Sequence, residues 1–359
     1  MTRGQPRPLC IAPMVDRTDR AFRVVMRAIT RRTLLYTEMI PVGAVLGPRS
    51  DRVLAFDPVE RPLALQLGGN DPATLARAAR LAAARGYDEI DLNCGCPSAR
   101  VGSGGFGVVL MAEPERVAAC VEAMAAAALR PITVKHRLGF DALDRYEDVA
   151  RFVQRVARAG AARFIVHARK AILGRLSPRQ NRQVPPLRPQ WVHRLKADFP
   201  RLKIELNGGI TSLSEAFTHL DAGLDGVMIG RAAFEDPMIF ADADPWLEAW
   251  HRGEARPAAR VVGAGERIAM VRSLRPIVDR WLEGGGRLCE IVRPMLGLAH
   301  GIPGARRFRA DLVEGARAPT AGVEVFDQAL CALATVGREV GAVRRGSGGQ
   351  KRTGSPLET

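Results

Sequence analysis

The sequence has no long hydrophobic run, few aromatic residues and no dense cysteine framework. Without an apolar stretch of membrane-spanning length, we expect no membrane-crossing segment. The first residues, MTRGQPRPLCIAPM, lack the apolar core of a secretion signal. The six cysteines are scattered, without the spacing of a disulfide scaffold. Together these absences predict a reduced protein of the cytoplasm, and we expect a monomer.

Metal-binding patterns are also missing. The six histidines are dispersed along the chain. Cys94 and Cys96 form a C-x-C pair without two further ligands at zinc spacing. We therefore expect no metal.

Acidic residues are in deficit. The 359 residues include 53 Lys and Arg against 38 Asp and Glu, a formal net charge of +15. A surplus of this size favours a polyanionic partner, nucleic acid above all. Only five of the basic residues are lysine, so a coding bias toward arginine is the alternative explanation.

Short apolar runs recur along the first two thirds of the chain, each followed by a helical pattern. Eight such units in a row predict an α/β fold, a closed (β/α)8 TIM barrel of parallel strands. A doubly wound open sheet is the alternative. The expected strands are 9–14, 33–39, 63–69, 89–94, 132–137, 164–169, 203–209 and 226–231.

Strand patterns cease after residue 236 and helical patterns follow, which predicts a small helical bundle appended to the barrel. The last residues are rich in Gly, Ser and Arg, as in disordered tails. The expected organisation is an N-terminal extension (1–8), a barrel (9–243), a helical domain (244–343) and a disordered tail (344–359).

Polar residues and glycines stand where the predicted strands end. In this barrel class the carboxyl ends of the strands carry the chemistry, so these residues predict one site at the barrel mouth. The loops after strands seven and eight are where such barrels hold a phosphate. A cation such as Lys135 suits an FMN site, because it stabilises a reduced, anionic flavin ring. The residues are Pro13, Met14, Gln66, Asn93, Lys135, His167, Asn207, Gly208, Gly209, Gly230 and Arg231.

The segment GSGGFG (102–107) satisfies the G-x-G-x-x-G pattern of dinucleotide-binding folds. In those folds the first glycine follows a strand directly and opens a helix, whereas here seven residues intervene. We reject that interpretation and expect the glycines to give flexibility to a loop over the mouth.

These features together resemble one family. The segments APMVDRTDRAFR, LALQLGGNDP, DLNCGCPSARV, VKHRLG, LNGGI and GVMIGRAAF are similar to those of tRNA-dihydrouridine synthases. LSPRQNRQVPPL and GLAHGIPGARRFR resemble the A-type branch of that family. The similarity covers about residues 9–333. It implies an FMN-bearing barrel, a helical RNA-binding domain, NADPH as reductant, and reduction of uridines 20 and 20a in tRNA.

The resemblance also implies residue roles. Pro13 and Met14 would contact the flavin, and Gln66, Lys135 and His167 would hold its ring and ribityl chain. Cys96 would be the catalytic acid. The residues implied in tRNA contact are Asn93, Arg179, Arg182 and Arg293. The chain departs from the family pattern at Cys94, which is usually apolar, and at Pro294, which interrupts a usually continuous helix.

The chemistry of uracil fits a cysteine acid. Hydride addition at C6 leaves an enolate that needs a proton at C5, and an ordinary thiol is largely protonated at neutral pH. Cys96 lies beyond the strand, before Pro97, whereas Cys94 at the strand end reads as a small buried hydrophobe. A redox disulfide between them is the alternative.

Two other functions compete with this one. The first is an FMN barrel that acts on a small-molecule pyrimidine, which leaves the charge of +15 and the helical domain unexplained. The second is an RNA-binding protein on a barrel that has lost its activity, which the intact Cys96, Lys135 and His167 argue against.

Overall fold

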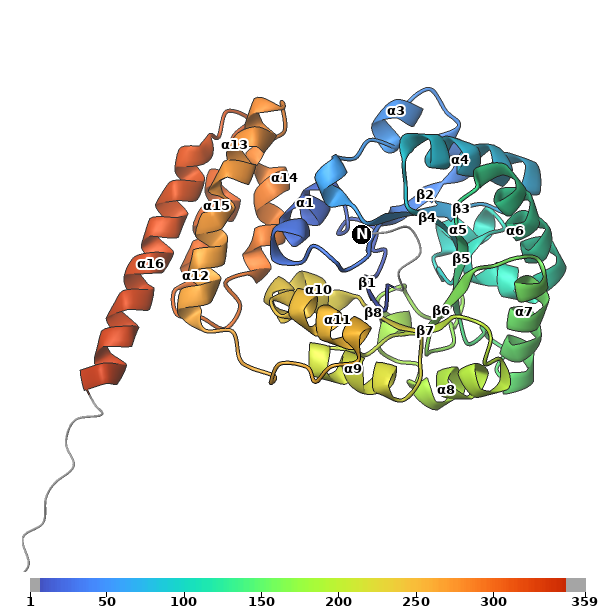
Figure 1. Cartoon of the computed structure of the whole chain (residues 1–359). Coiled ribbons are helices and arrows are strands. Elements are labelled where there is room, and N and C mark those ends of the chain that lie inside the picture. Colours follow the sequence, from blue (N-terminus) through green and yellow to red (C-terminus); the bar gives the residue numbers. More distant parts are fainter. Residues whose placement is uncertain (1–6, 347–359) are drawn as a thin grey trace, which may run out of the picture. The chain divides into compact units, whose positions relative to one another are not determined.

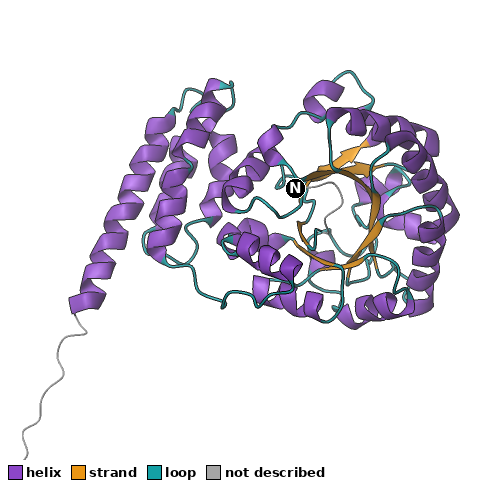
Figure 2. Ribbon diagram, in the orientation of Figure 1, coloured by secondary structure: helices purple, strands orange, loops and turns teal. Residues whose placement is uncertain are grey.

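The chain forms a closed parallel barrel and a separate helical unit. The computed structural model describes residues 7–346, with side chains through residue 335. Eight strands form one parallel sheet, ringed by helices (Figures 1 and 2). The predicted TIM barrel is confirmed. The strands are β1 (Leu9–Ile11), β2 (Leu35–Pro41), β3 (Leu63–Gly68), β4 (Glu89–Cys94), β5 (Ile132–Arg137), β6 (Arg163–His167), β7 (Ile204–Asn207) and β8 (Gly226–Ile229).

The sheet closes between its first and second strands. Each of the other strands pairs with the next in sequence, and β1 pairs with β8. Cys10 of β1 bridges in parallel to Leu34, one residue before β2. The Ile11 amide donates to the Leu34 carbonyl at 2.9 Å. No strand edge is therefore left open at this seam.

Amphipathic helices cover the outside of the barrel. Their ends follow local chemistry: the Asp71 side chain accepts from the Thr74 amide, Pro72 opens the helix, and Gly86 ends it in the left-handed region. The longer helices are α1 (Arg20–Ile29), α4 (Pro72–Arg85), α6 (Pro114–Ala128), α7 (Tyr146–Arg158), α8 (Pro189–Asp198), α9 (Leu213–Asp221) and α11 (Ala243–Arg252).

Short helices fill the loops between these elements. The loop after β2 holds only short pieces, whereas the loops after β4, β6 and β8 combine a short piece with a longer helix. The short elements are α2 (Val42–Val45), α3 (Ser50–Val53), η1 (Pro58–Glu60), α5 (Ala99–Ser103), η2 (Gly107–Ala112), η3 (Gln180–Arg182), α10 (Arg231–Glu235) and η4 (Pro237–Phe240).

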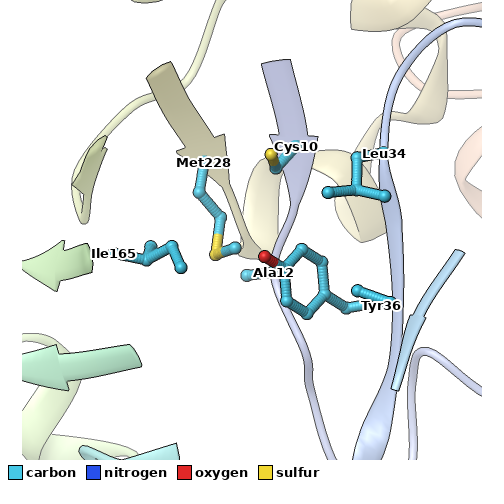
Figure 3. Close-up of a cluster of buried hydrophobic side chains, with 7 residues drawn as sticks. Cys10, Ala12, Leu34, Tyr36, Ile165 and Met228 are labelled. Carbon is cyan, nitrogen blue, oxygen red and sulfur yellow. The ribbon is translucent and has the colours of Figure 1, made fainter. Parts of the chain in front are cut away.

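The inside of the barrel is packed. Tyr36, Ile165 and Met228 converge there from β2, β6 and β8 (Figure 3). At the amino ends of the strands, Arg163 forms ion pairs with Glu89 and Glu205. Apolar contacts and compensated charges therefore fill this part of the barrel interior.

The chain divides into two compact units, residues 1–259 and 260–359. The division falls later than the boundary predicted between residues 243 and 244, because α11 packs on the barrel. Asp244 accepts hydrogen bonds from the Thr30 hydroxyl at 2.7 Å and from the Arg32 amide at 3.0 Å. The Trp246 ring packs edge-on against Phe217, with ring centroids 5.2 Å apart.

The second unit is helical, as its pattern indicates. Pro294 ends the regular helix after Val292, and a 3-10 segment continues from Arg293. The first three residues of the predicted tail (344–359) continue the last helix of this unit, and the rest of the tail lies outside the described residues. The elements are α12 (Ala264–Ser273), α13 (Arg275–Glu283), α14 (Leu288–Val292), η5 (Arg293–Gly297), α15 (Ala305–Gly315) and α16 (Val323–Gly346). Over the described residues, no helix is both long and apolar enough to span a membrane.

Candidate active site at the carboxyl ends of the strands

A buried polar layer lies inside the barrel, above the apolar core. Strand register places Gln66 beside Asp91, and Asp91 beside Thr133. Asp91 Oδ2 accepts from Gln66 Nε2 at 2.7 Å, and Oδ1 accepts from the Thr133 hydroxyl at 2.7 Å. Burial raises the pKa of Asp91 to about 7, against the opposing effect of these hydrogen bonds.

Lys135 of β5 and Asn207 of β7 form a pair across the barrel. Lys135 Nζ donates to Asn207 Oδ1 at 3.0 Å, and Asn207 Nδ2 donates to the Met228 carbonyl at 2.8 Å. Because both partners have fixed donor and acceptor roles, the orientation of the Asn207 amide is determined. Burial lowers the pKa of Lys135 to about 8, and the nearby Asp91 opposes this shift.

His167 lies at the end of β6, beside the glycine pair that follows β7. Its Nδ1 is buried and has no hydrogen-bond partner among the described residues. Burial lowers the pKa of His167 well below its usual value, and Arg137 and Lys135 add to the effect, so the ring is neutral. A neutral ring with an unpartnered buried nitrogen is ready to bond a ligand.

Gly208 and Gly209 adopt φ values of +106° and +85°. A Cβ at Gly208 would lie 3.1 Å from the His167 ring, and one at Gly209 would lie 2.6 Å from Leu187. The left-handed backbone conformation favours glycine at both positions, and an added side chain would press on the His167 ring or displace the end of Leu187. Gly230 belongs to the same end of the barrel, because a Cβ there would lie 3.6 Å from Ala12 and 3.9 Å from Met14.

The loop after β1 is held in one shape by its own side chains. The Met14 amide donates to the Thr18 hydroxyl at 3.0 Å, and the Thr18 amide donates back to the Met14 carbonyl at 3.0 Å. Pro13 and Met14 are half-buried in this turn, next to Ala12 at the end of β1. The turn therefore presents fixed backbone groups near the ends of β1 and β8.

Cys96 lies on a loop that is fixed from two sides. The Asn93 side-chain oxygen accepts from the Gly95 amide at 3.1 Å and from the Cys96 amide at 2.9 Å. The Cys96 carbonyl accepts from the Val108 amide at 3.0 Å. The Cys96 side chain is half-buried and interacts electrostatically with Lys135 and with two arginines, Arg137 and Arg182. The thiol is thus brought to the polar mouth of the barrel.

Cys94 has a different environment, although only one residue separates it from Cys96. It is fully buried on the opposite face of β4 from Asn93, and its sulfur is free. Burial raises the pKa of Cys94 well above its usual value. The expected buried role of Cys94 agrees with this position.

Arg137 is a site residue that the sequence analysis missed. Its guanidinium is buried and donates to the carbonyls of Gly95, Lys170 and Asn181 at 2.9, 3.1 and 3.0 Å. It therefore joins the Cys96 loop to the loop after β6. The sequence could have indicated this residue. Arg137 lies two residues after Lys135 in β5, and alternate residues of a strand point to the same side, here the barrel interior.

The loop after β6 carries a group of arginines. Arg179 and Arg182 flank the buried Asn181 at η3, and both are exposed. Arg231 donates to the Arg182 carbonyl at 3.3 Å. Burial lowers the pKa of Arg182, and repulsion from Arg231 and Arg17 lowers it further. Positive charge is thus concentrated at the mouth.

Arg293 belongs to the second unit. It is exposed at the start of η5. The other predicted residues of the barrel all lie at or just beyond the carboxyl ends of the strands. The structure brings together Gln66 with Asn93, and Lys135 with Asn207, in direct hydrogen bonds.

The glycine-rich segment 102–107 differs from the expected loose loop. It forms the end of α5 and the start of η2. A Cβ at Gly107 would lie 2.7 Å from the Cys96 carbonyl, and the Asn70 side chain donates to the Gly105 carbonyl at 3.0 Å. These glycines permit close packing beside Cys96. Among the residues with a described structure, no cluster of three metal-binding side chains occurs.

Comparison with known proteins gives one consistent result. The family profile described as dihydrouridine synthase matches residues 10–334. A tRNA-dihydrouridine(20/20a) synthase of Synechocystis sp. is 49% identical over 323 residues, 90% of this chain and 93% of the relative. The protein of the same name from Xanthomonas axonopodis pv. citri is 50% identical over 322 residues, 90% and 92% of the two chains.

A solved structure supports the fold alone. 2-Naphthoyl-CoA reductase, in complex with 2-naphthoyl-CoA, is 8% identical, with a TM-score of 0.51 over 69% of this chain and 50% of that chain. The family match extends across the barrel and most of the helical unit. This chain belongs to the dihydrouridine synthase family.

Proposed function

We propose that this protein reduces uridines 20 and 20a of tRNA to 5,6-dihydrouridine, with FMN as cofactor and NADPH as reductant. The observation that carries the proposal is the seating of Cys96, a half-buried thiol fixed beside the Lys135 and Arg137 cations at the barrel mouth. Relatives that bear the name tRNA-dihydrouridine(20/20a) synthase support the choice of substrate.

The residues at the mouth fit a flavin mononucleotide. The unpartnered Nδ1 of His167 and the Lys135 ammonium suit the polar atoms of a flavin ring and ribityl chain. Gly208 and Gly209, where side chains would fill the space, leave room for a phosphate near Arg231. Gln66, Asn207, Gly230 and the backbone of Pro13 and Met14 complete the proposed set. When bound, the flavin supplies the hydride that adds to C6 of uracil.

Cys96 acts as the general acid in this proposal. Addition at C6 leaves an enolate on the uracil ring, and the Cys96 thiol gives its proton to C5. Lys135, Arg137 and Arg182 place positive charge near the Cys96 side chain. Asn93 orients the uridine, and its oxygen holds the loop that carries the thiol.

The tRNA is held mainly through its phosphates. Arg179 and Arg182 lie exposed beside the mouth, and Arg293 is exposed in the helical unit. A net charge of +15 gives the backbone of the RNA a long-range attraction. The target uridine leaves its stack to reach the mouth, at a cost of a few kcal/mol.

An anaerobic reoxidation experiment tests this function. Purified protein is reduced with NADPH and mixed with an unmodified tRNA transcript or with uridine monophosphate. Reoxidation by the transcript, and none by the nucleotide at equal concentration, is the expected result. Reoxidation by the nucleotide alone supports a small-molecule reductase, and none by either substrate overturns the proposed activity.

A further inference from the structure

A chain of buried hydrogen bonds runs from the barrel interior to the loop of Cys96. It begins at Thr133, passes through Asp91, Gln66 and Asn93, and ends at the amides of Gly95 and Cys96. Thr133, Asp91 and Gln66 are each at most 1% exposed, and Asn93 is 8% exposed. Water is therefore not an alternative partner for most of these groups.

Each link in this chain has one possible direction. The backbone amides of Gly95 and Cys96 only donate, so the Asn93 atom that they meet is the oxygen. The Asn93 nitrogen then donates to Gln66 Oε1 at 2.8 Å. The Gln66 nitrogen in turn donates to Asp91 Oδ2 at 2.7 Å. Asp91 is the acceptor at the inner end, so the two side-chain amides are held from both ends of the chain.

We propose that Asp91 is a positioning residue for the reaction, and that it acts through Gln66 and Asn93 to hold the Cys96 loop in its active geometry. The proposal rests on the function proposed above. Asp91 contacts neither Cys96 nor its loop directly. Without an acceptor at position 91, the Gln66 amide is free to turn over, and the hydrogen bond by which its oxygen holds the Asn93 side chain is lost. Asn93 is then held only by the loop that it should support.

Substitutions at position 91 separate hydrogen bonding from charge. Asp91→Asn keeps an oxygen that accepts from Gln66 and removes the charge, so it should leave the Cys96 loop in place. Asp91→Ala removes the acceptor, and Asp91→Leu does so with closer to native volume, should the alanine variant fail to fold. Glu205→Ala is the matched control, because Glu205 is also a buried carboxylate inside the barrel but lies at its other end.

Hydrogen exchange gives a readout that does not depend on activity. Mass spectrometry follows a peptide that contains Gly95 and Cys96, whose amides are the last donors in the chain. Asp91→Ala or Asp91→Leu should speed the exchange of these two amides at least about tenfold, while Asp91→Asn and Glu205→Ala stay within about twofold of the parent. Unchanged exchange in the Asp91→Ala and Asp91→Leu variants overturns the relay even if tRNA proves to be no substrate.

Single-turnover kinetics then tests the link to the reaction. Reoxidation of the bound flavin by tRNA, measured per flavin, should slow about ten- to hundredfold in Asp91→Ala or Asp91→Leu and recover in Asp91→Asn. Because Asp91 acts through Asn93, the double variant with Asn93→Ala should be no slower than Asn93→Ala alone. Additive losses, or equal losses in the alanine and asparagine variants, contradict the proposal. A parent protein that tRNA does not reoxidise contradicts the proposed function instead.

Discussion

Cys94 and Cys96 stand one residue apart and lie in different surroundings. Cys94 is fully buried on the helix-facing side of β4, whereas Cys96 is half-buried on the loop beyond it. In the structure both sulfurs are free. Only Cys96 lies at the mouth, where a base can meet it.

This difference predicts opposite phenotypes. Cys96→Ala should slow uridine reduction about 10²- to 10⁴-fold, because it removes the proposed general acid, while flavin content and flavin reduction by NADPH persist. Cys94→Val preserves a small apolar side chain and should leave all three properties close to those of the parent. Dihydrouridine formation, absorbance of bound flavin and stopped-flow reduction measure them. An exchange of phenotypes between the two variants would falsify the assignment.

Gly208 tests the cofactor site at a single position. Gly208→Ala forces a side chain into the left-handed region and against the His167 ring, 3.1 Å away. It should lower flavin occupancy of the purified protein. Gly223→Ala is the control, because Gly223 has φ +94° with nothing within 4 Å of the added Cβ. Both variants carry the strain of about 1–2 kcal/mol, so equal flavin loss would assign the effect to strain alone.

His136 predicts a pH dependence of stability. The ring is fully buried between Phe152 and Phe164, and burial lowers the pKa of His136 from 6.5 to about 4. Between these two pH values the His136 ring is protonated in the unfolded chain but neutral in the folded protein. The free energy of unfolding therefore falls as the pH falls. The loss from this residue reaches about 3 kcal/mol near pH 4.

Chemical unfolding of His136→Gln measures this effect. The variant removes the titration, so its unfolding midpoint should fall less than that of the parent between pH 7 and pH 4. His300→Gln, at an exposed position of the second unit, serves as the control and should follow the parent. If the unfolding midpoints of the parent and of His136→Gln fall equally between pH 7 and pH 4, then His136 does not cause the loss of stability in acid.

At the scale of elements, the strand ends were readable from sequence and the connections between them were not. Short apolar runs ending in Gln66, Lys135 or His167 predict both the barrel and the rim of its mouth, because all parallel strands end on one side. The contacts of Arg137 depend on loops distant in sequence, and those of Asp91 depend on the register of β4 against β3 and β5. Strand parity places such residues inside the barrel, but only the folded loops decide what they bond.

Two other elements show the same limit. The glycines of residues 102–107 indicate freedom of the backbone, but the structure uses them to pack α5 and η2 closely beside Cys96. Strand signals end near residue 236, which suggested an early boundary. Asp244 accepts hydrogen bonds from the residues that follow α1, and Trp246 packs on Phe217, so α11 belongs to the barrel unit.

The loop after β6 makes a prediction of its own. If Arg179 and Arg182 contact phosphates, Arg179→Gln and Arg182→Gln should each reduce the slope of log affinity against log salt by about one unit or less. Flavin reduction by NADPH should not change, since both side chains are exposed on the loop after β6. Filter binding of tRNA at several salt concentrations gives the slope.

Arg201→Gln is the matched control for this loop. Arg201 is exposed just before β7, at the amino end of the strands and thus at the opposite end of the barrel. For Arg201→Gln, the slope of log affinity against log salt should equal that of the parent protein. If the Arg179 and Arg182 variants have the same slope as the Arg201 variant, then Arg179 and Arg182 do not contact phosphates and are ordinary exposed residues.

At the scale of the whole molecule, the barrel carries the chemistry and the charge recruits the substrate. The polar layer, the Cys96 loop and the arginines after β6 all lie in the first unit. The second unit adds further arginines, Arg293 among them, to a chain with a net charge of +15. A small-molecule reductase has no need of either feature, which is why tRNA is the substrate that accounts for the molecule as a whole.

Mapping of the product tests this account most directly. Purified protein, NADPH and an unmodified tRNA transcript are incubated, and dihydrouridine is located by mass spectrometry of nuclease fragments. The account predicts dihydrouridine at positions 20 and 20a with the parent protein, and none with Cys96→Ala or with a transcript that carries cytidine at both positions. Product formed at full rate by Cys96→Ala, or no product from a parent protein whose flavin NADPH reduces, would contradict it.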